Sequence, residues 1–249
     1  MMEQLRSRQN PTVQRLRKLA ADGVFRREQR EYLCDGGKLL REAMDKGACV
    51  HSVLWRDRAE EIGLPEAVRQ FVASGELFDY VSPMKNSPGP IFTLGIPDMP
   101  EPVFDRAILL ENVQDPGNVG TVIRTAAAMG VETVLLVGAC ADVYSPKTAR
   151  ATMGAIFRER LIRCTAEEAK SFAERNGLKL YGAALSGRAA DIRTLNLKSA
   201  VVAIGSEGRG LSDELLRLCD GELIIPMSPG SESLNAAMEA SVILWEMAR

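Results

Sequence analysis

Short apolar runs alternate with longer amphipathic stretches through the C-terminal half of the chain. The apolar runs predict strands over 107–111, 133–137, 178–185, 200–205 and 222–226. The amphipathic stretches predict helices over 118–129, 146–153, 166–175, 211–218 and 234–248. Because strands that alternate with helices usually form a sheet covered on both faces, this pattern predicts an α/β domain with a mostly parallel sheet.

The N-terminal part shows a similar but less regular pattern. It predicts helices over 12–22, 37–47 and 60–74, and strands over 49–55, 77–81 and 91–94. Prolines cluster between residues 83 and 102, and each of them fixes φ and removes a backbone donor. We therefore place a boundary near 97–103, between a small α/β domain over 1–97 and a larger domain over 104–249.

Composition excludes several classes of protein. The chain has 249 residues, of which 46% are hydrophobic and 26% are charged, as in ordinary soluble proteins. It contains no apolar run long enough to cross a bilayer and no N-terminal secretory pattern, so we expect a cytoplasmic protein without membrane contact. The five cysteines form no Cys-x-x-Cys pair and His51 is the only histidine, so we expect no metal site and no Ser-His or Cys-His nucleophile.

Charge is distributed unevenly along the chain. The formal net charge is only −2, but residues 1–41 contain ten Lys or Arg against five Asp or Glu. A basic N-terminal arm suits contact with a phosphate backbone. The alternative is a solvated helix face, because Arg15, Lys18 and Asp22 lie at helical spacing.

Polar residues occupy one side of the predicted helix 118–129. At 100° per residue, Asn118, Thr121 and Arg124 fall on one side, whereas Val119 and Ile123 fall on the other. One face can therefore pack on the sheet while the other presents an amide, a hydroxyl and a guanidinium that suit a phosphate. The alternative is an ordinary amphipathic helix with a surface arginine. The chain lacks a P-loop motif and a dinucleotide-binding glycine motif.

Glycines also open the loop after the predicted strand 200–205. The loop Gly205-Ser-Glu-Gly-Arg-Gly210 exposes backbone groups that can bind an adenine edge or a ribose, and Glu207 can accept hydrogen bonds. The alternative is a tight turn in which Glu207 pairs with Arg209. A third polar loop, between 226 and 235, leads into the last predicted helix. That helix is apolar on several sides, which indicates a subunit interface or else packing within the monomer.

Together, these three segments resemble the signature motifs of the SpoU/TrmH family of RNA 2′-O-ribose methyltransferases, within the SPOUT superfamily. The family's Asn-x-Gly-x-x-x-Arg is matched by Asn118, Gly120 and Arg124. Its Gly-x-Glu-Gly-x-Gly is matched by Gly205, Glu207, Gly208 and Gly210. Its third motif is matched by Ile225, Pro226, Met227, Ser233, Leu234 and Asn235. The similarity spans about 107–247, and the N-terminal part is similar to the small substrate-binding domain of many members.

The resemblance implies an α/β domain with a deep trefoil knot, and a homodimer whose active site lies near the subunit interface. It implies S-adenosylmethionine bound by Gly205, Ile225, Met227 and Leu234. It further implies a catalytic set of Asn118, Arg124, Glu207, Ser233 and Asn235. Since arginine is hardly ever deprotonated, we expect Arg124 to clamp an RNA phosphate and to stabilise developing alkoxide charge.

The expected function is S-adenosylmethionine-dependent 2′-O-methylation of a ribose in RNA. The resemblance of the N-terminal domain to that of rRNA-modifying members favours ribosomal RNA over transfer RNA. The alternatives are a tRNA ribose methyltransferase, a base methyltransferase of a sister group, and a non-catalytic RNA-binding or assembly factor.

Overall fold

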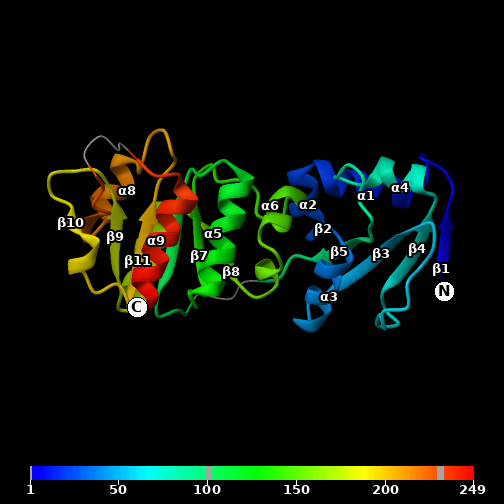
Figure 1. The fold of residues 1–249 in the computed structure, drawn as a ribbon, viewed down its shortest axis with the longest axis horizontal. Coiled ribbons are helices and arrows are strands. Elements are labelled where there is room, and N and C mark those ends of the chain that lie inside the picture. Colours follow the sequence, from blue (N-terminus) through cyan, green and yellow to red (C-terminus); the bar gives the residue numbers. More distant parts are fainter. Residues whose placement is uncertain (1, 99–102, 229–232) are drawn as a thin grey trace. The chain divides into compact units, whose positions relative to one another are not determined.

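The computed structural model describes residues 2–98, 103–228 and 233–249, and the chain divides into two compact units (Figure 1). The first unit contains the residues up to Asp98 together with Tyr144–Phe157. The second contains the described residues up to Val143 that follow Asp98, and Arg158–Arg249. The segment 144–157 thus packs in the first unit, although its position in the sequence is within the expected domain 104–249. As domains, the ranges 1–97 and 104–249 stay predictions.

The first unit is built on a five-stranded mixed sheet in the order β1-β4-β3-β5-β2. Its strands are β1 (Met2–Leu5), β2 (Glu31–Asp35), β3 (Val50–Arg56), β4 (Arg69–Ala73) and β5 (Ile91–Gly95). Its helices are α1 (Pro11–Ala21), α2 (Gly23–Gln29), α3 (Gly37–Asp45), α4 (Gly75–Val81) and α6 (Pro146–Ala151), followed by a 3-10 turn at Ala155–Phe157. Strand β5 is antiparallel to β2 and β3, whereas the β1-β4-β3 pairs are parallel.

Apolar side chains of α1 and α4 form one core of this unit with the sheet. Leu16 and Leu19 of α1 and Phe78 of α4 lie in the same buried cluster as Leu33 and Leu54 of the sheet. The spacing of the two leucines, three residues apart, places both on the inner face of α1. The segment 144–157 adds Tyr144, whose ring lies 4.9 Å from that of Tyr32 between centroids.

Two of the sequence predictions for this unit are wrong. Residues 69–73 of the expected helix 60–74 form β4, and the expected strand 77–81 lies within α4. Pro65 interrupts the expected helix, since the residue before a proline is disfavoured in the α region. Ser74 then caps α4 by accepting a hydrogen bond from the Leu77 N–H at 3.4 Å, so the helix begins after Ser74 rather than ending there.

The second unit contains an all-parallel sheet of seven strands in the order β10-β12-β9-β11-β6-β7-β8. The strands are β6 (Ala107–Glu111), β7 (Thr133–Val137), β8 (Arg160–Cys164), β9 (Lys179–Ala183), β10 (Ala190–Asp191), β11 (Ala200–Ile204) and β12 (Gly221–Ile224). The helices are α5 (Pro116–Ala128), α7 (Ala166–Arg175), α8 (Asp213–Leu218) and α9 (Ala236–Ala248), with a 3-10 turn at Ile192–Thr194.

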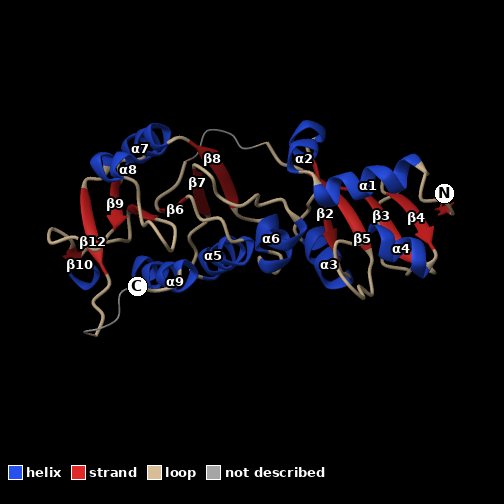
Figure 2. Cartoon of the chain, turned by 90° about the horizontal axis from the view of Figure 1, so that it is seen from above, coloured by secondary structure: helices blue, strands red, loops and turns tan. Residues whose placement is uncertain are grey.

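Helices cover both faces of this sheet. Figure 2 shows α7 and α8 on one side of the strands and α5 and α9 on the other. Accordingly every residue of β6, β7 and β11 is buried, which is why these strands are continuous apolar runs in the sequence. The sequence predictions for the C-terminal half are confirmed: both 107–111 and 133–137 match their strands, and the five predicted helices, including α6 of the first unit, are present with ends shifted by at most a few residues.

Several elements had no counterpart in the sequence predictions. They are β1, β2, α2, β8 and β10. Strand β8 alternates buried and partly exposed residues at the edge of the sheet, where two arginines break its apolar pattern. No helix within the described ranges has the length and apolar character of a membrane span.

Candidate functional site

The predicted motifs of the second unit meet at the carboxyl ends of its parallel strands. This is the edge at which open α/β sheets bind ligands. A cavity of about 470 Å³ lies there. Its lining includes residues of the loops that follow β9, β11 and β12, and of the first turns of α9.

Glycine 205 lets the loop after β11 close tightly on itself. A Cβ atom at this position would lie 2.0 Å from the Gly210 carbonyl carbon and 2.3 Å from the Leu211 nitrogen, so no other residue fits. The Gly210 N–H donates to the Ser206 carbonyl at 2.9 Å, and Gly210 has a φ of +65°. The resulting loop brings backbone groups and the Glu207 side chain to the cavity.

One residue that sequence reasoning missed holds this loop in place. Glu111, at the end of β6, is only 4% exposed and accepts hydrogen bonds from the Ser212 N–H at 2.7 Å and the Ser212 hydroxyl at 2.6 Å. Ser212 in turn caps α8. The available signal was a single carboxylate at the end of an otherwise apolar strand, since a buried charge needs hydrogen-bond partners.

Three polar side chains, one from each motif, form a hydrogen-bonded chain beside the cavity. The Asn118 amide nitrogen, in the first turn of α5, donates to the Glu207 carboxylate. The Asn118 amide oxygen accepts from the Asn235 amide nitrogen at 3.3 Å. Asn235 also caps α9 through the Ala237 N–H, at 3.0 Å. Residues 118, 207 and 235, far apart in the sequence, are therefore neighbours in the fold.

Glu207 does not form the ion pair with Arg209 that the alternative of a tight turn would require. The described ion pairs do not include one between Glu207 and Arg209, and the carboxylate is bound by Asn118 instead. Asp115 fixes the start of α5, because its carboxylate accepts the Asn118 N–H at 2.9 Å. The Asn118 side chain is thereby left for Glu207 and Asn235.

The structure places the other predicted site residues as follows. Gly205, Ile225, Met227, Ser233 and Leu234 line the same cavity as Glu207. Arg124 lies on the exposed side of α5, and no hydrogen bond or ion pair among the described residues joins it to the rest of the set. The burial pattern of α5 matches the helix wheel, with Val119 and Ile123 buried and Thr121 and Arg124 exposed. The individual roles assigned to these residues stay predictions.

A carboxylate missed by the motifs also borders the cavity. Glu239, in the first turn of α9, is among the lining residues, and burial raises its pKa to about 7. No hydrogen bond to its carboxyl group is found among the described residues. A desolvated carboxylate without a partner favours a cationic ligand nearby. The sequence signal was an acidic residue, Glu239, early in a mostly apolar helix whose other acidic residue, Glu246, pairs with Arg249.

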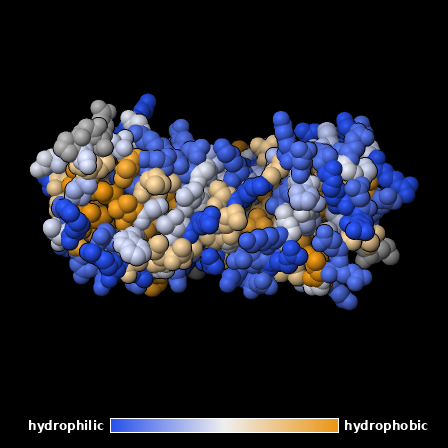
Figure 3. Space-filling view, in the orientation of Figure 1, coloured by the Kyte–Doolittle hydropathy of each residue, from blue (hydrophilic) through white to orange (hydrophobic). Residues whose placement is uncertain are grey.

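The cavity combines apolar walls with this polar edge. Leu211, Leu216, Leu223 and Leu234 are among the lining residues. Figure 3 shows hydrophobic residues gathered at the end of the second unit where β9 and β10 lie, and Ala183 of β9 and the loop after it belong to the lining. Within the described ranges no group of three or more His, Cys, Asp or Glu is arranged to hold a metal ion.

The last helix carries an apolar stripe that the monomer leaves exposed. Ile243, Leu244 and Met247 are buried, whereas Met238 and Trp245 are 62% and 58% exposed. Val242, between them, is 39% exposed. The positions 238, 242 and 245 follow the four- and three-residue spacing of one helix face. The helix is therefore apolar on two sides, one of which packs within the unit.

Comparison with known proteins agrees with this geometry. Residues 105–245 match the SpoU rRNA Methylase family. An uncharacterized tRNA/rRNA methyltransferase of Synechocystis is 31% identical, over 98% of this chain and 92% of the relative. The 23S rRNA (guanosine(2553)-2′-O)-methyltransferase RlmP of Bacillus subtilis is 28% identical, over 99% of both chains.

Solved structures lead to the same family. The crystal structure of an AdoMet-bound rRNA methyltransferase from Sinorhizobium meliloti superposes with a TM-score of 0.87 and 27% identity, covering 99% of this chain and 97% of that one. The match therefore includes the N-terminal unit as well as the parallel sheet. With its three motifs joined in one place and its whole length matched, this chain belongs to the SpoU rRNA methylase family.

Proposed function

We propose that the protein transfers the methyl group of S-adenosylmethionine to the 2′-hydroxyl of a ribose in ribosomal RNA. The observation that carries the proposal is the hydrogen-bonded chain of Asn118, Glu207 and Asn235 at the edge of the cavity. Relatives add support, since the Bacillus subtilis protein is named as a 23S rRNA 2′-O-methyltransferase and the Sinorhizobium meliloti structure contains AdoMet.

The cavity fits S-adenosylmethionine in size and in chemistry. Its volume of about 470 Å³ lies within the ~300–1,000 Å³ range of small-molecule sites. The loop 205–210 offers backbone groups to the adenosine part, and the leucine walls cover apolar surface. The unpartnered Glu239 carboxylate suits a cation, and the cofactor carries a sulfonium and an ammonium group. When bound, the cofactor supplies an electrophilic methyl group.

The residues of this chain then have separate tasks. Asn118 holds the Glu207 carboxylate and Asn235 in one orientation, so that their free acceptors and donors can bind the ribose hydroxyls. Arg124 is exposed and forms no ion pair with the described residues, so it is available to an RNA phosphate beside the reacting ribose. Its charge also stabilises negative charge that develops on the 2′-oxygen as the proton leaves.

We further propose that the protein is a homodimer that uses the exposed stripe Met238, Val242 and Trp245 of α9. Such a stripe matches the apolar centre of subunit interfaces. Five free thiols are in keeping with a cytoplasmic location. The trefoil knot stays an expectation from the family resemblance.

The decisive experiment maps 2′-O-methylated positions in total RNA from cells with and without the gene. We expect one ribosomal RNA position to lose its methyl group in the deletion strain and to regain it when the wild-type gene returns. A lost position in transfer RNA would move the substrate to tRNA. An unchanged map, with purified protein that transfers no radiolabelled methyl group to deletion-strain RNA, would favour a non-catalytic factor.

A further inference from the structure

A second cavity lies wholly within the first unit, apart from the motifs. Its volume is about 350 Å³. It is bordered by the start of α3, by the loop 84–88 after α4, and by the end of α6 with the turn that follows. The lining residues are Asp35, Gly36, Lys38, Leu39, Glu42, Met84, Lys85, Asn86, Ser87, Pro88, Arg150 and Met153. All of them belong to the unit that includes segment 144–157.

Three cations, Lys38, Lys85 and Arg150, border this cavity together with two carboxylates, Asp35 and Glu42. Lys38, Lys85 and Arg150 form no ion pair with any residue that the structure describes. The neighbouring Asp35 accepts hydrogen bonds from the Ser82 hydroxyl at 2.9 Å and from the Ser87 hydroxyl, and its carboxylate also attracts Arg150, although the two form no salt bridge. Unpaired cations gathered from three segments favour an anionic ligand.

Apolar groups lie among these charges. Leu39, Met84, Pro88 and Met153 contribute to the lining, and Met153 is 52% exposed. The Arg150 guanidinium contacts the Met84 sulfur, which places a planar cation next to a thioether. Thioethers adapt to flat ring systems, and guanidinium planes stack on bases. The cavity therefore offers surfaces for an aromatic ring beside cations for a phosphate.

The basic N-terminal arm is less available than its charge suggests. Arg26 is buried and donates to the Leu19 carbonyl at 2.6 Å, so it is part of the fold. Arg15 pairs with Glu31, and Arg30 pairs with Asp98 at 2.6 Å. Arg8 pairs with Glu76 at 2.8 Å. Much of the excess positive charge of residues 1–41 is thus used within the unit, in contrast to the charge at the cavity.

We propose that this cavity binds one unpaired nucleotide of the RNA substrate. Lys38, Lys85 and Arg150 hold its phosphate, and Met84 and Met153 contact its base. The volume lies at the lower end of small-ligand sites, as expected for one nucleotide rather than a helix. This inference deepens the proposed function, on which it rests for the identity of the ligand as RNA.

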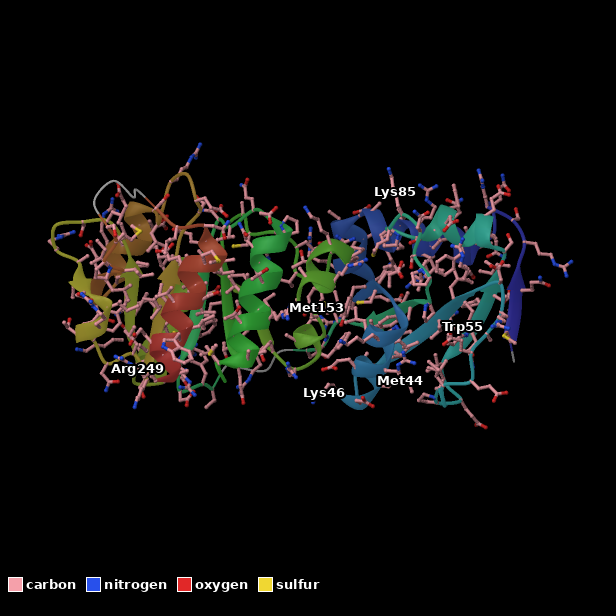
Figure 4. All side chains as sticks on the ribbon, in the orientation of Figure 1. Met44, Lys46, Trp55, Lys85, Met153 and Arg249 are labelled. Carbon is pink, nitrogen blue, oxygen red and sulfur yellow. The ribbon has the colours of Figure 1, made fainter. Side chains whose placement is uncertain are left out.

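The test measures binding of a fluorescein-labelled single-stranded RNA of about 12 nucleotides to the full chain by anisotropy, over a range of salt concentrations. The charge variant is the double substitution Lys85→Gln with Arg150→Gln. The base-contact variant is Met153→Ser. The matched control is Lys46→Gln, which removes one exposed charge just after α3 and outside the cavity; Figure 4 labels Lys46, Lys85 and Met153.

We expect the charge variant to weaken binding about tenfold and to reduce the slope of log affinity against log salt by about 1 to 1.5. Met153→Ser should weaken binding about threefold or more while leaving that slope unchanged. The control should bind within about twofold of wild type. Thermal unfolding and S-adenosylmethionine binding, measured in parallel, should be the same for all four proteins, because the substituted residues are exposed.

Three results would overturn the inference. First, the charge variant could bind the RNA as tightly as wild type does. Second, the charge variant could lose as much affinity for the 12-mer annealed to its complement as for the single strand. Third, AMP, GMP, CMP or UMP alone could bind the wild-type protein as tightly as the RNA does. The last result would assign the cavity to a free nucleotide. Failure of the proposed function has a different readout. It would appear as an unchanged 2′-O-methyl map and as absent methyl transfer, independently of how tightly the oligonucleotide binds.

Discussion

At the scale of single residues, the side chains that the motifs predicted differ in how firmly the fold holds them. Asn118, Glu207 and Asn235 are joined by hydrogen bonds, whereas Arg124 is exposed and forms no hydrogen bond or ion pair with the part of the chain that the structure describes. The sequence alone predicts that Asn118, Glu207 and Asn235 share one site only through the family resemblance. The motifs do not include Glu111 or Glu239. The contact of Glu111 with Ser212 and the position of Glu239 at the cavity depend on how the strands and helices pack.

We expect Arg124 to contribute to methyl transfer but not to binding of the methyl donor. We expect Arg124→Ala to lower the methyl-transfer rate by about a hundredfold or more, as loss of one preorganised charge-stabilising group commonly does. Its dissociation constant for S-adenosylmethionine should stay within about twofold, because Arg124 does not line the cavity. Radiolabelled transfer to deletion-strain RNA and calorimetry measure the two quantities, and Arg124→Lys tests whether charge alone suffices. Parallel loss of both would contradict the phosphate role.

We expect Glu239 to make the affinity for S-adenosylmethionine depend on pH. Burial raises its pKa to about 7, so the carboxyl is mostly neutral at pH 6 and ionised at pH 8. Because the anion attracts the sulfonium, affinity for S-adenosylmethionine should rise with pH through about 7. Affinity for S-adenosylhomocysteine, which lacks the sulfonium charge, should rise less. Calorimetry at both pH values measures each ligand.

The matched variant Glu239→Gln removes the titrating charge at similar size. It should bind S-adenosylmethionine like wild type at pH 6 and up to about tenfold more weakly at pH 8, which corresponds to about 1.4 kcal/mol. A wild-type protein with the same preference between the two ligands at pH 6 and 8 would show that Glu239 does not face the sulfonium.

At the scale of elements, the sequence predicts the second unit far better than the first. Strands buried on both faces are continuous apolar runs, so 107–111 and 133–137 stand out from the helices around them. In the first unit, the sequence predicts that residues 69–73 belong to a helix over 60–74, because Leu64, Val68 and Phe71 fit helical spacing. These residues form strand β4 because they pair with β1 and β3. That pairing is a long-range contact, which the periodicity of the sequence cannot show.

The loop after β11 provides a matched pair of glycines. Gly205→Ala places a Cβ within 2.3 Å of the backbone of Gly210 and Leu211, so the loop must move. We expect loss of measurable S-adenosylmethionine binding and a lower melting temperature, because overpacking costs about 1–3 kcal/mol or more. Gly208→Ala meets no protein atom within 4 Å and should keep the melting temperature of wild type. Equal behaviour of the two variants would show that the loop adapts freely.

At the scale of the whole molecule, the exposed stripe of α9 predicts the oligomeric state. Trp245 is 58% exposed in the monomer, so Trp245→Glu should leave folding intact and convert a dimer into a monomer. Light scattering after size-exclusion chromatography measures this directly. Val103→Glu, at a site that is 74% exposed outside the helix, serves as the control and should remain dimeric. A monomeric wild type would contradict the homodimer.

The crossing of the chain between its two units restricts how the protein can be divided. The first unit is completed by Tyr144–Phe157, which the chain contributes only after it has begun the second. A fragment that ends at residue 98 would lack α6 and Tyr144, whose ring contacts that of Tyr32, and would leave part of β2 uncovered. The N-terminal unit therefore cannot be moved as one continuous segment. Fusing it to another enzyme would require two separate segments of the gene.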